Sequence, residues 1–326
     1  DSAGIFVDLQ GVDPGLRVGD EIDVEGVSSP GEFAPSVRYR HHVRHGRTML
    51  PAPIRPPTRE LWAGTFDSQW VETSGIVRRV SLDANQHLDL ELDVDGMRVG
   101  AQVPGFRGAP PTHLVDAELR VTAVAGTIFN SRGQLTGIQL LVPGMSHLVT
   151  ARPAPPDPFS LPVRAVDTLQ RFDADARAGH RVHIKGVVTY AHDRAMYVSD
   201  SAGGIEVRLT ASTAFSPGDL VEAIGFPERG AVSPMLAEAT VRRVGRAPLP
   251  APAQPGPSGV EQTALDSQLV QMDGVLVTRT PANDGLVLLI EGHGQLFSAV
   301  LRGPVARAVP AAVSSGSQLR VTGVYK

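Results

Sequence analysis

The chain has 326 residues, of which 42% are hydrophobic and 20% charged, with 30 basic and 34 acidic residues and a formal net charge of −4. This apolar content is enough for ordinary small cores and excludes a disordered chain. The slight negative balance disfavours a surface that coats nucleic acid. The chain has no cysteine, which excludes disulfides, thiol catalysis and thiolate metal sites. No apolar run approaches the ~18 residues that a membrane-spanning helix needs.

Two segments near the start of the chain recur about 200 positions later. Residues 1–7 (DSAGIFV) return as 200–207 (DSAGGIEV), and residues 19–26 (GDEIDVEG) return as 218–225 (GDLVEAIG). We call a unit that contains this pair of segments an A unit. Similarity at a fixed period indicates duplicated structural units rather than one large fold.

A second type of unit, the B unit, alternates with the first. Residues 67–71 (DSQWV) return as 266–270 (DSQLV), and residues 119–122 (LRVT) return as 319–322. The order along the chain is therefore A, B, A, B, and each unit is about 100 residues long, a usual size for a domain. We name the four units A1, B1, A2 and B2.

Clusters of proline separate the units, within residues 51–57, 153–162 and 248–257. Proline fixes φ and removes a backbone donor, so these clusters predict extended, semi-rigid linkers. A1 lacks the strand that residues 181–190 supply in A2, and B2 stops before any equivalent of residues 126–142, so we expect a fragment of a longer protein. The predicted domains are 1–50 (truncated at its N-terminal end), 58–150, 159–247 and 259–326 (truncated at its C-terminal end).

Alternation of apolar and polar residues predicts strands along the whole chain. It is clearest in residues 88–94 (LDLELDV), where apolar side chains share one face and carboxylates share the other. Residues 181–185 (RVHIK) alternate in the same way and lead into Gly186, where we expect a bulge that bends the strand. Helical character is confined to residues 166–172 and 259–265.

Five short strands in a unit of this size predict a small barrel of the OB type, which protects its strand edges by closure. The predicted fold class is therefore all-β, with tandem five-stranded OB-like barrels joined by proline-rich linkers. A sandwich formed across two units is the alternative. The alternation predicts that the core of A2 contains Val182, Ile184, Val207, Leu209, Val221 and Ala223.

Three histidines in the basic stretch 38–47 (RYRHHVRHGR) raise the question of a metal site. The repeat aligns this stretch with a predicted strand of A2, and on a strand His41 and His45 would share a face about 13 Å apart. One ion cannot bind both at bond lengths of about 2 Å, and His42 faces the opposite side from His45. We predict no metal site; a solvated basic strand and a contact with an anion or a partner are the interpretations that remain.

Asp89, Glu91 and Asp93 form a stripe of carboxylates with about 6.7 Å between neighbours. Such pairs can hydrolyse glycosides where they line a cleft, but on an alternating strand they indicate a solvated outer face. The sequence contains no Walker-type loop, no Gly-x-Ser-x-Gly elbow and no His-Glu-x-x-His pair. We therefore predict no catalytic residue, no cofactor and a chain that is not itself an enzyme.

Residues 126–135 (GTIFNSRGQL) place an Asn-Ser-Arg-Gly turn between two apolar runs, which predicts a hairpin. Hairpin tips on small barrels are positions where such modules bind ligands. Phe129, Asn130 and Arg132 are therefore candidate ligand-binding residues, together with Tyr197, a strand-borne aromatic residue that could stack on a ligand. An ordinary turn with a core phenylalanine is the alternative.

Several segments resemble a known family: residues 197–205 (YVSDSAGGI), residues 217–227 (PGDLVEAIGFP), and the stretch from 126–130 (GTIFN) to Gln139. They are similar to the tandem OB-like extracytoplasmic region of bacterial membrane-bound sensor histidine kinases and related signalling proteins. The resemblance covers essentially the whole chain. It implies a region that precedes a transmembrane helix and a cytoplasmic signalling output, and it carries over no ligand-binding residue.

The first functional hypothesis is a non-catalytic, extracytoplasmic sensory or interaction region, attached to the membrane and to its output through segments outside these residues. The absence of cysteine fits that location. The alternative is a region that binds single-stranded nucleic acid, or the accessory part of a secreted nuclease, because OB barrels bind strands with basic grooves and aromatic residues. The 5% aromatic content and the negative net charge argue against this alternative. A carbohydrate-binding module is a third hypothesis.

Overall fold

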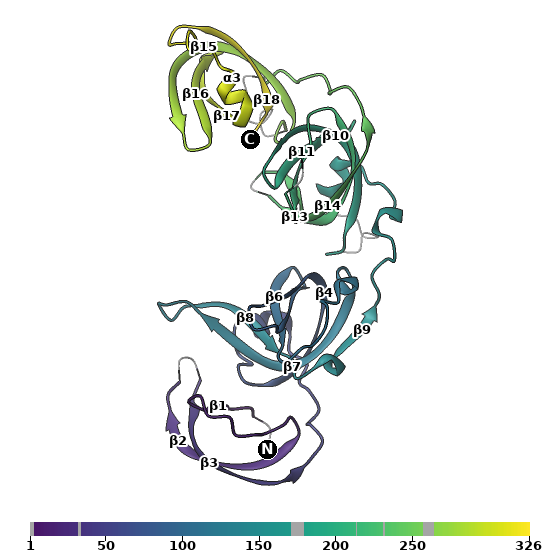
Figure 1. Ribbon diagram of the computed structural model, residues 1–326, viewed down its shortest axis with the longest axis vertical. Helices are drawn as coiled ribbons and strands as arrows, with labels where there is room; N and C mark the ends of the chain where they lie inside the picture. Colours follow the sequence, from purple (N-terminus) through teal and green to yellow (C-terminus); the bar gives the residue numbers. More distant parts are fainter. Residues whose placement is uncertain (1–2, 32–33, 171–178, 213, 231, 257–263) are drawn as a thin grey trace. The chain divides into compact units, whose positions relative to one another are not determined.

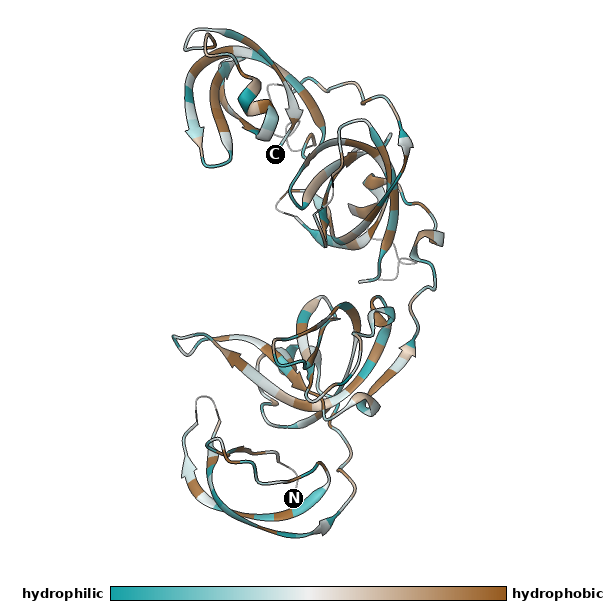
Figure 2. Ribbon diagram, viewed as in Figure 1, coloured by the Kyte–Doolittle hydropathy of each residue, from teal (hydrophilic) through white to brown (hydrophobic). Residues whose placement is uncertain are grey.

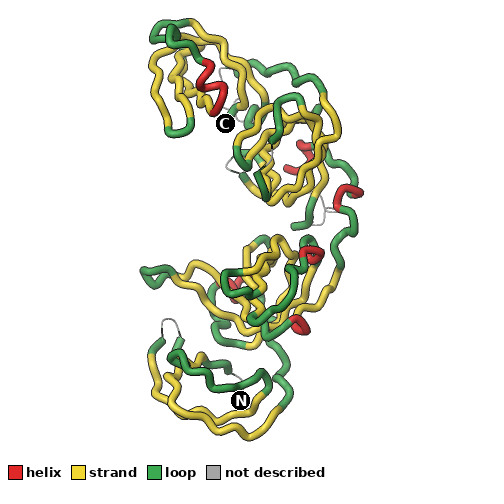
Figure 3. Tube along the Cα trace, in the orientation of Figure 1, coloured by secondary structure: helices red, strands yellow, loops and turns green. Residues whose placement is uncertain are grey.

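The computed structural model describes residues 3–31, 34–170, 179–212, 214–230, 232–256 and 264–326. Strands dominate these residues and the helices are short (Figure 3), which confirms the predicted all-β class. The chain divides into two compact units, Asp1–Pro156 and Asp157–Lys326. The first contains A1 and B1 and the second contains A2 and B2, each with a sheet of its own (Figure 1).

A2 closes into a five-stranded barrel with the ring order β10-β11-β12-β14-β13. Strand β10 pairs antiparallel with both β11 and β13, and β12 pairs parallel with β14. This is the closed five-stranded arrangement of an OB barrel, as predicted. The strands are β10 (Val182–His192), β11 (Ala195–Ser199), β12 (Gly204–Leu209), β13 (Asp219–Arg229) and β14 (Pro234–Arg246).

The core of A2 follows the predicted alternation. All six predicted core residues belong to one apolar cluster, in which Leu209 is partly buried and the others are buried. In β12, Ile205 and Val207 are fully buried while Arg208 is exposed, and Figure 2 shows hydrophobic and hydrophilic residues alternating along the strands. Burial of each such aliphatic side chain contributes about 1.5–3 kcal/mol, so the inward face of the strands stabilises the barrel.

The predicted bulge at Gly186 is wrong. Gly186 lies in regular register opposite Val221, and the irregularity in β10 falls between Val188 and Tyr190. Glycine is needed at position 186 for another reason: a Cβ there would lie 2.5 Å from the carbonyl oxygen of Ser199 on β11. The two strands approach each other too closely at this point for any side chain.

B1 closes in the same way, with the ring order β4-β5-β6-β8-β7, and β9 pairs antiparallel with the first residues of β7. The parallel pair β6–β8 corresponds to β12–β14 of A2. Helix α1 (Thr58–Trp62) precedes the barrel and contributes Leu61 to its core. The strands are β4 (Trp70–Leu82), β5 (Leu88–Val94), β6 (Met97–Val103), β7 (Glu118–Phe129), β8 (Leu135–Leu141) and β9 (Leu148–Arg152).

A1 and B2 form open sheets whose strand orders match parts of the closed barrels. A1 has the order β1-β3-β2, in which β1 runs parallel to β3 as β12 runs parallel to β14 in A2. B2 has the order β17-β16-β15-β18, which matches β6, β5, β4 and β7 of B1. The elements are β1 (Phe6–Asp8), β2 (Asp20–Ser29), β3 (Ser36–Arg47), β15 (Leu269–Ala282), β16 (Gly285–Gly292), β17 (Gln295–Arg302), α3 (Gly303–Ala308) and β18 (Gln318–Val324).

Short turns of 3-10 helix complete the described structure, at Thr112–Leu114, Met145–His147, Pro158–Ser160 and Val166–Gln170. The last of these confirms the helical turn predicted at 166–172 as far as Gln170, and residues 171 and 172 lie outside the described residues. Most of the second predicted turn, residues 259–263 of 259–265, also lies outside the described residues.

The proline-rich linkers are hydrogen-bonded to the sheets that follow them. One residue in or directly after each proline cluster forms an isolated parallel β-bridge with the first strand of the next unit, and the three bridges are Ile54–Val71, Val163–His183 and Ala253–Val270. In the first bridge the Ile54 N–H donates to the carbonyl of Trp70 at 2.9 Å, and the Ile54 carbonyl accepts from Glu72 at 2.7 Å. The linkers are therefore edge-paired segments and not free spacers.

Candidate ligand-binding site

A pocket with a volume of about 540 Å³ opens at one end of the A2 barrel, where β11 begins and β12 ends. The turn between β10 and β11, the end of β12 and two residues of B2 line it. OB folds bind oligonucleotides and oligosaccharides on the face of their second and third strands and on the loop between the first and second. The polar lining residues are His192, Asp193, Arg194, Arg208, Asp284 and Arg302.

Strand pairing places the A2 residues of this pocket. His192 pairs with Ala195 across the β10–β11 hairpin, and Ala195 pairs with Arg208 on β12, so the three share the outer face of the barrel. Asp193 adopts a left-handed conformation at φ 53°, which a tight hairpin turn requires. The backbone of Arg194 accepts a hydrogen bond from Leu209 N–H at 2.8 Å. The turn and the end of β12 therefore form one corner.

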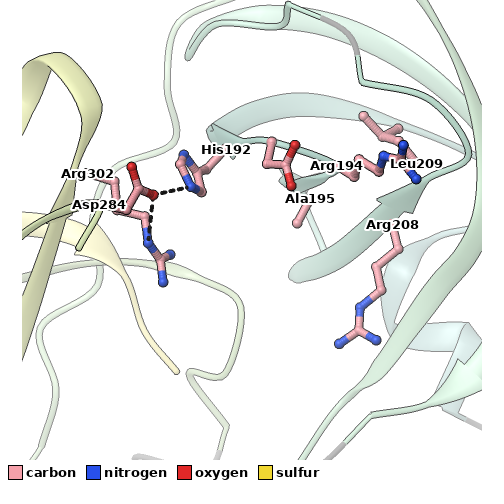
Figure 4. A pocket seen from close by; sticks show the side chains of 8 residues that line it. His192, Arg194, Ala195, Arg208, Leu209, Asp284 and Arg302 are labelled. Atoms are coloured by element: carbon pink, nitrogen blue, oxygen red, sulfur yellow. Dashed lines mark ion pairs between the residues drawn. The ribbon is translucent and has the colours of Figure 1, made fainter. Parts of the chain in front are cut away.

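Asp284 of B2 holds two of the basic groups in the pocket. Its Oδ2 lies 2.7 Å from His192 Nε2 and 3.9 Å from Arg302 Nε (Figure 4). Arg208 donates from Nε to Glu206 Oε1 at 2.9 Å. A guanidinium has five N–H donors in a fixed fork, so Arg208 and Arg302 retain donors beyond those that these carboxylates use.

The lining is suited to an anion. Arg194, Arg208 and Arg302 outnumber the two carboxylates of the pocket, Asp193 and Asp284. Arginine forks match phosphate and carboxylate groups in a bidentate geometry and form charge-assisted hydrogen bonds with them. None of the described lining residues carries a hydroxyl or a thiol.

Two tyrosines continue the same outer face beyond the pocket. Tyr190 and Tyr197 lie opposite each other with ring centroids 6.2 Å apart. The ammonium of Lys326 lies 5.5 Å from the ring centroid of Tyr197 and 2.9 Å from Glu206 Oε2. Burial raises the pKa of Tyr197, and the Glu206 carboxylate raises it further. Burial alone would raise the pKa of Glu206, but hydrogen bonds from Lys326 and Arg208 lower it overall.

The other predicted binding residues lie in B1, at the tip of the β7–β8 hairpin. This tip corresponds to the loop between the fourth and fifth strands of an OB fold, a second ligand-binding position. Asn130 Oδ1 accepts from the backbone N–H groups of Arg132 and Gln134, both at 3.0 Å, so its side chain stabilises the turn. Phe129 ends β7, and Arg132 is exposed. Tyr197 belongs to the other compact unit, and all four residues stay predictions as ligand contacts.

Arg194, Arg208 and Arg302 were not expected from the sequence. They come from a turn, from the end of one strand and from the end of a strand in a different unit. A signal did exist for the first two, because the DSAGG segment between two apolar runs indicates a hairpin of A2 that brings residues near 194 and 208 together. Nothing in the sequence pattern indicates that B2 adds Arg302.

The basic stretch 38–47 forms β3, and acidic residues of β2 neutralise part of it. Arg44 and Arg47 approach Asp20 Oδ1 at 3.1 and 3.3 Å. His45 Nε2 lies 2.8 Å from Asp23 Oδ2. A2 repeats the first arrangement around its own buried aspartate.

In A2 the equivalent aspartate is Asp219, which follows the repeated glycine at the start of β13. Arg243 and Arg246 approach it at 2.7 and 3.8 Å. Asp219 also accepts a hydrogen bond from the backbone of Ser216 at 2.9 Å. Because both A units keep this arrangement, the arginines at the end of the last strand have a structural role in joining it to the preceding strand.

The carboxylate stripe of B1 lies on the outer face of β5, as predicted. Glu91 pairs with Arg79 at 2.7 Å and with Arg98 at 2.8 Å, and Asp93 approaches Arg78 at 3.3 Å. These carboxylates already have basic partners on neighbouring strands. Asp89 accepts from Gln102 Nε2 at 3.1 Å, so each carboxylate of the stripe has a partner on a neighbouring strand.

Within the described ranges, no group of three or more His, Asp and Glu side chains is placed to hold a metal ion. In the same part of the chain, no helix combines the length and the apolar character that crossing a membrane requires.

No protein-family model matches the chain, and no curated protein matches it. Solved structures that resemble parts of it include tetrameric p202 HIN2, at 8% identity over 53% of this chain and 93% of that chain, with a TM-score of 0.25. A murine DNA-binding protein bound to double-stranded DNA matches at 12% identity over 56% and 99%, with a TM-score of 0.24. A multidomain protein from Streptococcus pneumoniae with nucleic acid binding domains matches at 12% identity over 77% and 67%, with a TM-score of 0.14. TM-scores this low carry no argument about function, which rests on the geometry of the pocket.

Proposed function

We propose that this chain is a binding region that binds single-stranded nucleic acid, with the A2 pocket as a phosphate-binding site. One observation carries the proposal: three arginines line one pocket where the OB fold generally binds its ligands, at the first hairpin turn and the end of the third strand. The local excess of basic groups supports binding of a phosphate even though the whole chain has a net charge of −4.

The neighbouring surface supports a nucleic-acid strand over a free anion. Proteins that bind single strands combine basic side chains along the backbone with aromatic rings on which bases stack. Tyr190 lies two residues before His192 on the same face, about 6.7 Å along the strand. A base stacked on Tyr190 would leave its phosphate near Arg208 and Arg194. A pocket of this size admits a nucleotide and not a duplex.

The sensory role, the extracytoplasmic location and the absence of catalysis stay predictions from the sequence. They are compatible with this proposal, since a sensory region needs a ligand and the pocket provides a place for one. A secreted nuclease that carries this region as an accessory part is equally compatible with it.

The test is binding of a fluorescently labelled oligothymidylate to the full chain, measured by fluorescence anisotropy at several salt concentrations. Contacts with phosphates release counterions, so log K should fall with log salt by about 0.7 for each phosphate contacted on a single strand. Three arginine contacts predict a slope near −2. The triple variant Arg194→Ala/Arg208→Ala/Arg302→Ala should lose binding and most of the slope.

A matched control separates the pocket from general charge. Arg307, at the end of α3, is an exposed arginine of B2 outside the pocket, and Arg59 and Arg107 are exposed arginines of B1. A control triple variant at these three positions removes the same charge and should bind as the wild type does. Equal losses in both triple variants, or no binding by the wild type at low salt, would contradict the proposal.

A further inference from the structure

The two most strongly repeated motifs of the chain meet each other in space. In the first compact unit, the glycine of the DSAG turn in A1 packs on the DSQ turn of B1: a Cβ on Gly4 would lie 1.7 Å from the carbonyl oxygen of Ser68. In A2 the turn reads DSAGG, and its second glycine, Gly204, takes the place of Gly4: a Cβ on Gly204 would lie 2.1 Å from the carbonyl oxygen of Ser267. Backbone therefore meets backbone at the same place in both A–B pairs, with no room for a side chain.

The DSQ turn adopts the same unusual backbone conformation in both pairs. Ser68 has φ 61° and Ser267 has φ 65°, in the left-handed region that residues other than glycine seldom occupy. Each serine hydroxyl donates to the aspartate before it, at 3.2 Å to Asp67 and 3.1 Å to Asp266. A strained conformation that recurs with the same partners is kept by its surroundings, and those surroundings include the glycine of the A unit.

Polar contacts hold each junction, though not with the same residues. In the first pair, the Gln69 side chain accepts from Gly4 N–H at 2.9 Å and donates to the Gly4 carbonyl at 3.3 Å. In the second pair, Lys326 of B2 binds Glu206 of β12 at 2.9 Å and Asp266 of its own DSQ turn at 3.5 Å. Glu206 and Asp266 are buried, so the lysine neutralises carboxylates on both sides of the junction.

The A-to-B linkers are attached at the same place in both pairs. Ile54 bridges to Val71, and Ala253 bridges to Val270. Val71 and Val270 are equivalent residues that follow the DSQ turn by the same number of positions. The linker and the DSAG turn therefore contact the same end of the first B strand, from two directions along the chain.

We infer that the DSAG turn of each A unit is a docking surface for the DSQ turn of the B unit that follows it, and that the A–B pair is one rigid body. The glycine of the A unit leaves room for backbone contact. The serine of the B unit, in its left-handed conformation, presents its carbonyl oxygen to that glycine. The inference does not depend on what the pocket binds. It does explain how Asp284 and Arg302 of B2 come to line a pocket of A2.

The test measures the spread of distances between A2 and B2 in the full chain. The chain contains no cysteine, so two introduced cysteines, Arg229→Cys and Arg307→Cys, can carry spin labels for pulsed electron paramagnetic resonance. A rigid pair should give one narrow distance peak. Gly204→Ala should abolish this peak and give a broad distribution, because its Cβ would collide with Ser267.

The adjacent glycine provides a matched control. A Cβ on Gly203 would meet only Val166 Cγ1, at 4.0 Å, an ordinary contact, so Gly203→Ala should keep the narrow peak. Lys326→Ala introduces no backbone collision but removes the ion pairs across the junction, so it should also broaden the distribution. This second variant tests the inference if Gly204→Ala fails to fold. A broad distribution in the wild type would overturn the inference. So would a narrow peak in folded Gly204→Ala.

The first compact unit allows an independent repetition. Labels at Arg40→Cys and Arg107→Cys report the A1–B1 pair. Gly4→Ala should broaden their distance distribution, while Gly46→Ala, where a Cβ meets nothing within 4 Å, should not. The same outcome in both units is expected because the motifs are the same. A loss of the peak in one unit alone would overturn the claim that the repeated motifs encode the docking.

Discussion

Replacing Ile184 with alanine should destabilise the A2 barrel and leave B1 unchanged. Ile184 lies on β10 with its side chain fully buried in the apolar cluster of the barrel. The substitution removes three methyl or methylene groups at about 0.8 kcal/mol each, or about 2.4 kcal/mol from transfer alone. The cavity left behind adds to this, because a closed barrel cannot collapse fully around it. We expect a total of about 2–5 kcal/mol.

The positions of the tryptophans allow this effect to be located. Trp62 and Trp70 are the two tryptophans of the chain, and both belong to B1. Tryptophan fluorescence during urea unfolding therefore reports B1, and amide hydrogen exchange of β10 and β13 reports A2. The exchange free energies of A2 should fall by the amount above, while the fluorescence transition stays where it is.

The neighbouring residue is the control for this experiment. Lys185 follows Ile184 on the same strand with its side chain 46% exposed, so Lys185→Ala should change stability by no more than about 0.5 kcal/mol. If Ile184→Ala cost as little as this control, the inward face of β10 would be assigned to the wrong side. If it shifted the tryptophan transition, the two compact units would not be energetically separate.

Two further predictions concern Asp67, in the first DSQ turn, and Glu206, which shares Lys326 with Asp266 of the second DSQ turn. Asp67 accepts hydrogen bonds from the Thr127 N–H at 3.0 Å and from the Thr127 hydroxyl at 2.8 Å, so Asp67→Ala should lower the unfolding free energy of B1 by about 1–3 kcal/mol. Tryptophan fluorescence during urea unfolding measures this change. An unchanged urea midpoint would show that water replaces the carboxylate. The lowered pKa of Glu206 means that its carboxylate stabilises the fold above the ordinary glutamate value of about 4.3, and this stability is lost as the pH falls through the lowered folded-state pKa. Hydrogen exchange of β12 should therefore quicken at acidic pH relative to intrinsic rates, and less so in Lys326→Met; an equal response in both proteins would exclude this pairing as the cause.

The repeated segments were sufficient to predict the fold. The DSAG segment and the Gly-Asp segment that begins at 19 or 218 recur with the same spacing, which indicated duplicated units. In strands such as 205–209, apolar and polar residues alternate with a period of two, and this alternation predicted that Val207 and Ile184 face the core. The prediction at Gly186 was wrong because alternation cannot distinguish a glycine that bends a strand from one that admits a close neighbour. That distinction depends on Ser199, which belongs to the next strand.

The candidate site was much less accessible to sequence reasoning. Its basic residues belong to different strands and different units, and no local pattern marks Arg194 or Arg302 as members of one group. Local patterns instead drew attention to His41 and His45, whose stretch is dense in charge. In the structure that density reflects pairing with the preceding strand, through Asp20 and Asp23. Clustering along the sequence and convergence in space are separate properties here.

Comparison of equivalent faces shows why A2 is the unit to test for anion binding. In B1, the face of the second and third strands carries Glu91 between two arginines, so its charges are already paired. In B2, the same face presents Val287 opposite Val300 and Leu289 opposite Ser298, and its Arg302 belongs to the lining of the A2 pocket.

A2 instead places Arg208 beside a tyrosine pair on this face. One scaffold thus supports three chemically different surfaces, because side chains on the outer face of a barrel are free to change while the inward residues are constrained by packing. Outer-face residues therefore distinguish the units, and among the described residues A2 combines an arginine that lines a pocket with a tyrosine pair beside it.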